Sequence, residues 1–454
     1  MKISSSVLAG AVALGAAADA KCAQQQMRNI VYFDQYHTAI LPPREVTTGI
    51  THVVMAFANS SLFAAPAGNG SKGYEPFMDV SKVRAMFDNG TQVGVAIGGW
   101  GDTAGFSEGA KTETSRKNYA KNVATMATKF GFDFIDCDWE YPGGNGADYK
   151  QIPNSQKVDE ITTFPLLLQE IKTAIQPRGL SIAVPAKAGD MIAYTAEHAS
   201  AIFGAVDMVN VMSYDIINRR DNATAHHTDV VGSLRAVDAY LALGCPAAKV
   251  NLGLAFYAKY FQTAKGVDCS GGPVGCPILP AENATDGSDL GTSGAITFEL
   301  ANVSPPPPPS NLTTSKDSSC GKGTFNTCSG LADAGCCSQY GFCGATPAHC
   351  GAGCQAGFGT CTGPQIGASF VSALKESKTD EVLGGQWWWD ASNELFWTLD
   401  TVPLIQRKFK DIVAARGLGG VFAWSLGEDS YDWSHLKVMT AGVKGLSKKT
   451  SSKK

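Results

Sequence analysis

The chain has 454 residues, 44% of them hydrophobic, so it can bury a large core and is long enough for one large domain with a small one. Its formal net charge is −4 at pH 7. This balance provides no basic surface for nucleic acid, which excludes nucleic-acid binding from the expected functions.

The first 20 residues have the pattern of a secretory signal peptide. Lys2 precedes an apolar run from Val7 to Ala18 and a small-residue cleavage site before Lys21. Because the run is too short for a mature membrane anchor, we expect a secreted, extracellular protein with no membrane partner. The 13 cysteines fit that compartment, where disulfides persist. Seven Asn-x-Ser/Thr sequons fit it as well: Asn59, Asn69, Asn89, Asn222, Asn283, Asn302 and Asn311.

Short apolar runs rich in β-forming residues recur along the chain, with longer segments between several of them. One such segment, Lys111 to Phe130, has helical periodicity and ends at Gly131. Alternation of strands and helices predicts a parallel sheet, and eight units predict an α/β fold of the (β/α)8 TIM-barrel type. The eight runs are Ile30–Phe33, Val53–Phe57, Val93–Ile97, Phe132–Asp138, Leu180–Val184, Met208–Met212, Val250–Ala255 and Gly420–Trp424.

The fourth run carries a row of acidic side chains. Because side chains alternate faces along a strand, Asp136, Asp138 and Glu140 share one face. Carboxylates about 6.6 Å apart, two residues at ~3.3 Å each, repel one another and raise at least one pKa, which keeps an acid protonated near neutral pH. A calcium loop or a solvated acidic turn is the alternative. The intervening Phe, Ile, Cys and Trp argue against both, since calcium loops are polar and contain glycine.

The spacing Asp133-x-x-Asp136-x-Asp138-x-Glu140 resembles the signature of glycoside hydrolase family 18, the chitinases and their relatives. The resemblance implies that Glu140 is the general acid, Asp138 the orienting carboxylate and Asp136 its proton-sharing partner, whereas Asp133 is structural. It also implies substrate-assisted, retaining hydrolysis of β-1,4 bonds between N-acetylglucosamine units. In that chemistry the 2-acetamido oxygen replaces the second carboxylate that most glycosidases use.

Other predicted strand ends fit the same family. Met212, Tyr214 and Asp215 match its Met-x-Tyr-Asp motif, which implies that Tyr214 bonds the acetamido carbonyl and Asp215 contacts the sugar. Trp424 matches the tryptophan beneath the reacting ring, with a buried core residue as the alternative. Further aromatic residues are expected at the cleft, although packing in the core stays open for the first three of them: Tyr32, Phe57, Trp100 and Tyr141.

One position departs from the family pattern. The run from Ala96 to Trp100 has alanine where the family's Ser-x-Gly-Gly has serine. The missing hydroxyl usually bonds near the first acid of the inward row, here Asp136. The resemblance therefore implies the chemistry of the site but not the tuning of its acidic pKa values.

Eight cysteines lie between residues 320 and 361 in a Gly-rich segment with too little apolar content for a core, so disulfides must hold it together. The run from Cys336 to Gly344 resembles the hevein-like chitin-binding modules, carbohydrate-binding module family 18. The resemblance implies sugar contacts by Ser338, Tyr340 and Phe342, with His349 in place of a third aromatic. A disulfide-knotted spacer is the alternative. The implied disulfides are Cys320–Cys337, Cys328–Cys343, Cys336–Cys350 and Cys354–Cys361.

The other five cysteines are scattered. Cys269 and Cys276 flank a loop rich in glycine and proline and are expected to pair with each other. Cys22, Cys137 and Cys245 leave an odd number, and their pairing stays open. Cys137 lies on the outward face of the acidic strand, so we expect a buried free thiol beneath a helix.

The seventh and eighth runs are separated by far more sequence than the others, which predicts a small α+β insertion after the seventh strand. A proline run interrupts the insertion and precedes the cysteine cluster, as a stiff linker. The predicted divisions are a signal peptide (1–20), the first part of the barrel (21–262), the first part of the insertion (263–303), a Pro-rich linker (304–319), the chitin-binding module (320–361), the insertion remainder with the end of the barrel (362–446) and a basic tail (447–454).

The sequence therefore predicts a secreted, monomeric chitinase whose partners are chitin and chitooligosaccharides and which needs no cofactor or metal. A lectin on the same barrel is one alternative, but such proteins typically lose the acid at the position of Glu140. An endo-β-N-acetylglucosaminidase acting on N-glycans is another, and the chitin-binding module weighs against it. Endo or exo action stays open.

Overall fold

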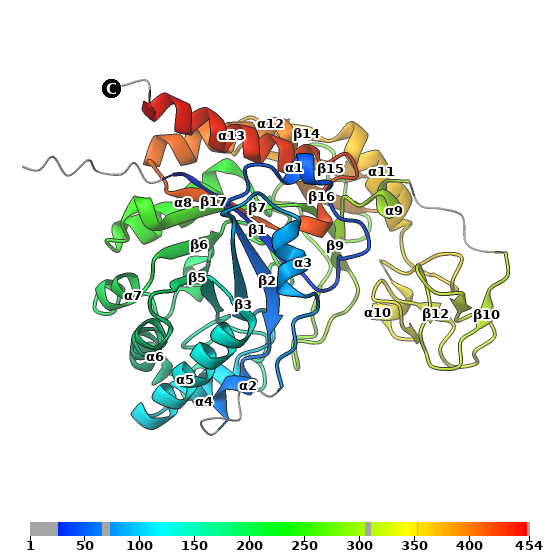
Figure 1. Ribbon diagram of the computed structural model, residues 1–454. Helices are drawn as coiled ribbons and strands as arrows, with labels where there is room; N and C mark the ends of the chain where they lie inside the picture. Colours follow the sequence, from blue (N-terminus) through cyan, green and yellow to red (C-terminus); the bar gives the residue numbers. More distant parts are fainter. Residues whose placement is uncertain (1–25, 66–72, 305–309, 352, 452–454) are drawn as a thin grey trace, which may run out of the picture.

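The computed structural model describes residues 26–65, 73–304, 310–351 and 353–451 (Figure 1). The predicted signal peptide, Cys22, the sequon at Asn69 and the prolines 305–309 lie outside these ranges. Within them, every helix is too short or too polar to cross a bilayer.

Eight parallel strands close into a barrel, which confirms the predicted fold. The strands follow one another around the barrel in chain order, and the last pairs with the first. Their carboxyl ends therefore meet at one face, where a TIM barrel carries its chemistry. The strands are β1 (Arg28–Asp34), β2 (His52–Ala58), β3 (Gln92–Gly98), β4 (Phe134–Asp138), β5 (Gly179–Pro185), β6 (Met208–Met212), β7 (Val250–Ala255) and β17 (Gly420–Trp424).

Helices surround the barrel (Figure 1). The helix expected over residues 111–130 is α5 (Glu113–Phe130), which begins with a capping box between Thr112 and Ser115 and ends at Gly131 in the left-handed conformation (φ 72°). The others are α1 (Arg44–Thr47), α2 (Ser61–Ala64), α3 (Val80–Ala85), α4 (Ala104–Ala110), α6 (Glu160–Ile175), α7 (Ala199–Ala205), α8 (Val230–Ala242), α12 (Val402–Lys408) and α13 (Ser434–Ser451).

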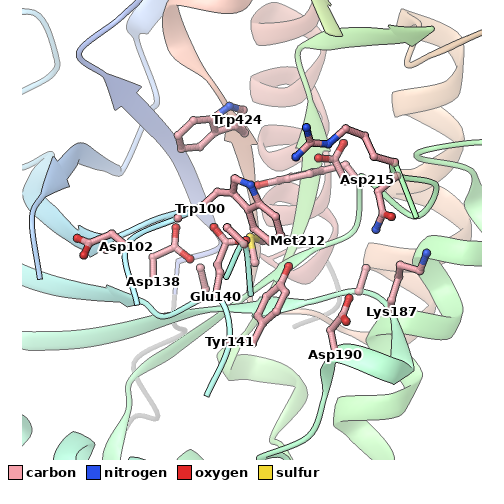
Figure 2. Close-up of a pocket in the computed structure, with 18 of the residues that line it drawn as sticks. Trp100, Asp102, Asp138, Glu140, Tyr141, Lys187, Asp190, Met212, Asp215 and Trp424 are labelled. Carbon is pink, nitrogen blue, oxygen red and sulfur yellow. The ribbon is translucent and has the colours of Figure 1, made fainter. Parts of the chain in front are cut away.

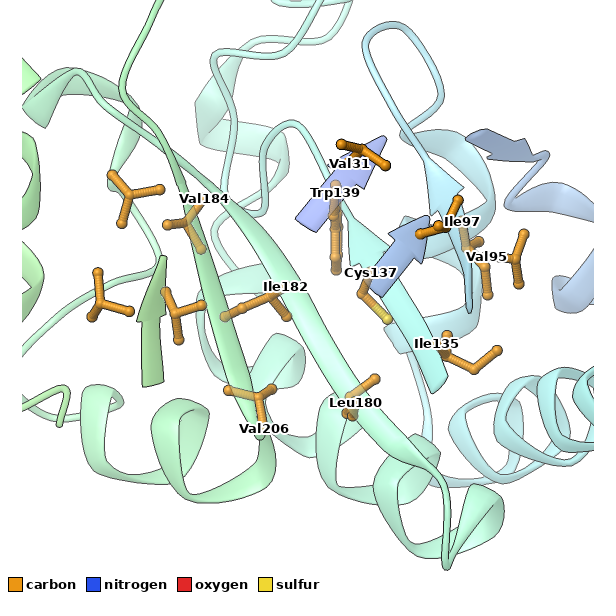
Figure 3. Close-up of a cluster of buried hydrophobic side chains, with 14 of the residues drawn as sticks. Val31, Val95, Ile97, Ile135, Cys137, Trp139, Leu180, Ile182, Val184 and Val206 are labelled. Atoms are coloured by element: carbon orange, nitrogen blue, oxygen red, sulfur yellow. The ribbon is translucent and has the colours of Figure 1, made fainter. Parts of the chain in front are cut away.

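The main core lies between the outward faces of the strands and these helices (Figure 3). Cys137 belongs to it, packed among residues such as Ile135 and Ile182, and is buried as predicted. Neither Cys137 nor the buried Cys245 pairs with another cysteine of the described residues, which do not include Cys22. The outward side chains of β4 therefore pack in the core, and the side chains on its opposite face point into the barrel.

A second, antiparallel sheet of five strands forms the insertion between β7 and β17. Helix α11 (Ile366–Glu376) packs on this sheet. The core between them contains the buried aromatic residues Tyr260 and Trp397 from the sheet and Phe370 from the helix. The strands, in sheet order, are β14 (Lys378–Asp380), β15 (Gly385–Asp390), β16 (Leu395–Leu399), β8 (Tyr257–Gln262) and β9 (Ser293–Thr297), and a short helix, α9 (Leu300–Val303), follows β9.

Three predicted boundaries need correction. Strand β8 belongs to the inserted sheet, so the first part of the barrel ends with β7 rather than at residue 262. Helix α13 continues to Ser451 and passes the predicted end of the barrel at 446. The predicted linker also overlaps the next unit, because β10 (Thr313–Thr314) pairs with β11 (Asn326–Thr327) inside the cysteine-rich segment. Each boundary depends on pairings between distant strands or on packing, which composition alone does not reveal.

The cysteine-rich segment has little regular structure and is held by four disulfides, which are the same pairs that the family resemblance implies. Besides β10 and β11 it contains β12 (Cys336–Cys337), β13 (Cys343–Gly344) and α10 (Pro347–Cys350). Cys269 and Cys276 also form a disulfide.

This segment rests against the insertion. The Tyr260 hydroxyl donates to Gln339 Oε1 at 3.3 Å, and Lys322 Nζ donates to the carbonyl of Ala301 at 2.9 Å. Gly291 lies so close that an added Cβ would be 2.6 Å from the Pro347 carbonyl oxygen. The segment is therefore docked on the inserted sheet through side chains and close backbone packing.

Candidate active site

The carboxyl ends of the barrel strands surround a cleft of ≈ 750 Å³ (Figure 2). Asp138 and Glu140 line it, and Asp136 lies buried one step deeper on the same face of β4. Asp133 instead accepts the backbone N–H of Val93 at 2.8 Å at the start of the strand, a structural contact. The alternation expected from the sequence thus brings the three acids together.

Asp136 is fully buried and accepts three hydrogen bonds. Ser181 Oγ donates to it at 2.5 Å, the Tyr32 hydroxyl at 2.8 Å and Asn210 Nδ2 at 3.3 Å. Burial raises the pKa of Asp136 to about 6, although these bonds favour the charged form and oppose the rise.

Sequence reasoning missed two of these partners, Ser181 and Asn210. In the sheet, Asp136 lies between Ala96 of β3 and Ser181 of β5. The hydroxyl that is missing at position 96 is therefore supplied from the other neighbouring strand. The contact between Ser181 and Asp136 could have been predicted from the sequence by aligning the predicted fourth and fifth strands in this register.

Asp138 is buried, with its Oδ1 lacking a hydrogen-bond partner among the described residues. Burial, and then the charges of Glu140 and Asp136, raise its pKa well above the usual range. An unpaired buried carboxyl oxygen is costly unless a ligand satisfies it. Asp138 is thus placed to bond a polar group of a bound substrate.

Glu140 follows β4 and borders the cleft beside Asp138 (Figure 2). Burial raises its pKa to about 7, and the charges of Asp215 and Asp190 add to the rise, while a hydrogen bond with Tyr141 opposes it. A carboxyl group with such a pKa holds its proton in a large fraction of molecules near neutral pH. Glu140 can therefore act as a general acid there.

The approach of β3 to the end of β4 requires glycine. Gly98 has φ 103°, and a Cβ there would lie 2.3 Å from the carbonyl oxygen of Asp138. That carbonyl accepts the N–H of Gly99 at 2.8 Å. The glycine pair thus holds the backbone of the acidic strand and leads to Trp100 at the rim of the cleft.

The end of β6 supplies Met212 and the loop after it supplies Tyr214 and Asp215, and all three line the cleft. Asp215 accepts the Tyr257 hydroxyl at 2.8 Å and Lys259 Nζ at 3.0 Å. Burial alone would raise the pKa of Asp215, but Lys259 and neighbouring hydrogen bonds hold it well below its usual range. Asp215 is therefore ionised, and Tyr257 and Lys259, to which the sequence assigned no role, orient it.

Aromatic side chains form the walls. Trp424 stacks on Phe57 with ring centroids 5.5 Å apart, and Tyr32 lies 5.7 Å from it. Trp100 is 51% exposed and lies 6.3 Å from Tyr141. All five line the cleft, although Tyr32 is itself buried.

The predicted residues of the cysteine-rich segment fall into two groups. Tyr340 and Phe342 are 66% and 57% exposed. Ser338 is buried, and its Oγ accepts the N–H of Phe342 at 3.2 Å. His349 is half-buried, with Nδ1 2.7 Å from Thr346 Oγ1. Of the four predicted sugar contacts, the two rings therefore expose the most surface to a ligand.

Two known proteins with similar sequences are chitinases by name. Endochitinase 1 of Metarhizium robertsii is 32% identical over 194 residues, which cover 38% of this chain and 42% of that protein. Chitinase 1 of Aphanocladium album is 27% identical over 276 residues, covering 52% of this chain and 60% of the relative. The chain thus spans about two fifths to three fifths of the length of these curated relatives.

Solved structures share the fold. The Group IV chitinase of Ostrinia furnacalis, in complex with allosamidin, aligns with a TM-score of 0.60 at 17% identity, over 92% of this chain and 99% of that one. A mutant GH18 chitinase of Cycas revoluta, in complex with (GlcNAc)4, aligns with a TM-score of 0.60 at 18% identity, over 91% and 99%. The model of the family described as Glycosyl hydrolases family 18 matches residues 28–429, from the first barrel strand to the segment after the last. The chain therefore belongs to glycosyl hydrolase family 18.

Proposed function

We propose that the protein is a secreted, monomeric chitinase that hydrolyses β-1,4 bonds between N-acetylglucosamine units with retention of configuration. The observation that carries the proposal is the pair formed by Glu140, an acid with a pKa of about 7, and Asp138, whose Oδ1 is buried and unpaired among the described residues. Both residues line a cleft that Trp424 also lines. One chain supplies all three, so the site needs no second subunit. Retention of Glu140 favours an enzyme over a lectin on the same barrel.

In the proposed reaction the sugar that reacts lies on Trp424. Glu140 donates its proton to the glycosidic oxygen as the bond from that oxygen to the anomeric carbon breaks. The acetamido oxygen of the same sugar forms a new bond to the anomeric carbon, while Asp138 accepts the acetamido N–H and Tyr214 bonds its oxygen. Water then attacks the anomeric carbon from the face opposite the acetamido oxygen and gives a proton to Glu140. The bond between the acetamido oxygen and the anomeric carbon breaks in the same step, which restores the acetamido group and the protonated acid.

The acetamido nucleophile gives the test of this function. Chitosan without acetyl groups should not be cleaved, because it has no oxygen to attack the anomeric carbon. Partly acetylated polymer should be cut only after acetylated units. Sequencing the new reducing ends checks this, and frequent unacetylated reducing ends would overturn the mechanism.

The pKa of Glu140 predicts the alkaline limit of activity. The general acid works only when protonated, so kcat/KM on neutral oligomers should fall as pH rises through about 7. The charge of Asp190 contributes to the raised pKa. Asp190→Asn should therefore lower the pKa of Glu140 and move this limb to lower pH, as a pH profile of initial rates would show. A limb that stays in place or moves to higher pH would contradict the assignment.

We also infer that the cysteine-rich segment binds chitin through Tyr340 and Phe342, whose exposed rings can stack on the apolar faces of sugars. Tyr340→Ala combined with Phe342→Ala should weaken adsorption to crystalline chitin about tenfold, the effect of removing interface anchors. Turnover of short soluble oligomers should stay within about threefold, since the gain from a second binding site is local concentration.

Phe325 offers a matched control for this test, because it is 64% exposed in the same segment and has no predicted sugar contact. Phe325→Ala should leave adsorption unchanged. Equal losses of adsorption in the control and the double variant would show that the segment is a spacer whose aromatic residues serve its packing.

A further inference from the structure

Two loops that are far apart in the sequence are joined across the mouth of the cleft. The loop after β4 contributes Tyr149, whose hydroxyl donates to Glu282 Oε1 of the insertion. In the same loop Lys150 Nζ donates to the carbonyl of Ala284 at 2.7 Å. Gln151 Nε2 donates to the carbonyl of Asp286 at 2.9 Å. We call residues 149–151 and 282–287 together the strap.

The insertion side of the strap is a tight hairpin. Residues 282 and 289 form an antiparallel bridge, and the N–H of Asn283 donates to the carbonyl of Ser288 at 2.8 Å. Gly287 has φ 74° at its turn. The Asp289 carboxylate lies 3.6 Å from Arg219, which lines the cleft. The hairpin is thus a fixed structure anchored beside the cleft.

Arg220, in the loop after β6, holds the loop after β4 beside the ring of Tyr149. Its two terminal nitrogens donate to the carbonyls of Asn145 at 2.9 Å and Gly146 at 3.0 Å. Its guanidinium also lies 3.9 Å from the ring centroid of Tyr149 and 5.6 Å from that of Trp100. Loops from β3, β4 and β6 and the insertion therefore meet at one place.

The strap lies on the leaving-group side of the acid. In Figure 2, Trp424 and Tyr141 lie on opposite sides of Glu140. A sugar that reacts on Trp424 places its leaving group beyond Glu140, toward Tyr141, whose ring centroid lies 6.3 Å from that of Trp100. Tyr149, Glu282 and Gly287 of the strap line the cleft together with these two rings.

We propose that the strap is a specificity determinant that restricts the leaving group to a short piece of chain. The inference rests on the proposed chitinase function. The leaving group carries the reducing end, because the bond that breaks is at the anomeric carbon of the preceding sugar. A wall at this side admits the last sugars of a chain and excludes a long continuation, so the enzyme releases mono- or disaccharides from reducing ends.

The test uses the N-acetylglucosamine hexamer with a fluorescent label at its reducing end. With the wild-type chain, the label should appear mainly on mono- or disaccharides. Glu282→Ala combined with Lys150→Ala removes two of the three strap bonds. It should raise the fraction of label on fragments of three or more sugars by at least about fivefold, because about fivefold is the population change expected for the loss of a single net hydrogen bond.

Two further variants keep the test decisive. Glu282→Gln retains an oxygen that can accept the Tyr149 hydroxyl and should keep the wild-type pattern. Lys150→Ala with Gln151→Ala changes only exposed side chains that bond backbone oxygens, so it should fold and shift the label in the same direction.

The outcomes separate the two proposals. If the wild-type chain places the label on long fragments, or if both strap-opening variants keep the wild-type pattern, the strap proposal is overturned while the chitinase function stands. If the folded wild-type chain cleaves no oligomer at all, the proposed function itself fails.

Discussion

Glu140→Gln is expected to lower the turnover of N-acetylglucosamine oligomers by about 10²–10⁴-fold, the usual contribution of general acid catalysis. Glutamine keeps the size and shape of the side chain but cannot donate the proton that the leaving oxygen needs. Binding of oligomers should survive, because Trp424, Tyr214 and Asp138 still form the cleft. Initial rates and calorimetric titration of the same variant measure the two effects separately.

Glu108→Gln is a suitable control, since this acid is exposed on helix α4, where it lies 3.6 Å from Lys111. It should change neither rate nor binding. Residual turnover of Glu140→Gln above about a hundredth of the wild-type rate would contradict the role of Glu140. Asp138, whose pKa is also raised, would then be the candidate for the general acid.

The second large effect concerns stability. Lys408 and Asp400 are fully buried, and Lys408 Nζ lies 2.9 and 2.8 Å from the two carboxylate oxygens and 2.6 Å from Thr228 Oγ1. Lys408→Met leaves the Asp400 charge buried without its partner. We expect the free energy of unfolding to fall by about 3–5 kcal/mol, measured by urea denaturation.

Two comparisons test the cause of that loss. Adding Asp400→Asn to Lys408→Met removes the orphaned charge and should recover part of the stability. Arg416 and Asp238 form a pair at the surface with a nitrogen–oxygen distance of 2.6 Å, so Arg416→Met should lower the free energy of unfolding far less than Lys408→Met does. A similar loss for both pairs, or no recovery in the double variant, would show that lost packing rather than a buried charge is responsible.

The barrel and its acidic row could be predicted from the sequence because both depend on local periodicity. Alternation along β4 places Asp136, Asp138 and Glu140 on one face whatever lies beside the strand. The helix that ends at Gly131 likewise follows from a glycine that adopts φ 72° without a steric penalty. The disulfides of the cysteine-rich segment could be proposed only through a family resemblance, since spacing alone does not select partners.

Contacts between distant segments were decided by the tertiary structure. Ser181 replaces the hydroxyl missing at Ala96 because β5 pairs with β4 in that register, which the closure of the barrel sets. The strap joins Tyr149 to Glu282, 133 positions away. The sequence by itself determined the acid and the strand that presents it, since a strand's period is local. Other strands and loops form the surroundings that set the pKa of this acid and the strap that limits the length of the leaving group. Only the folded chain therefore determines them.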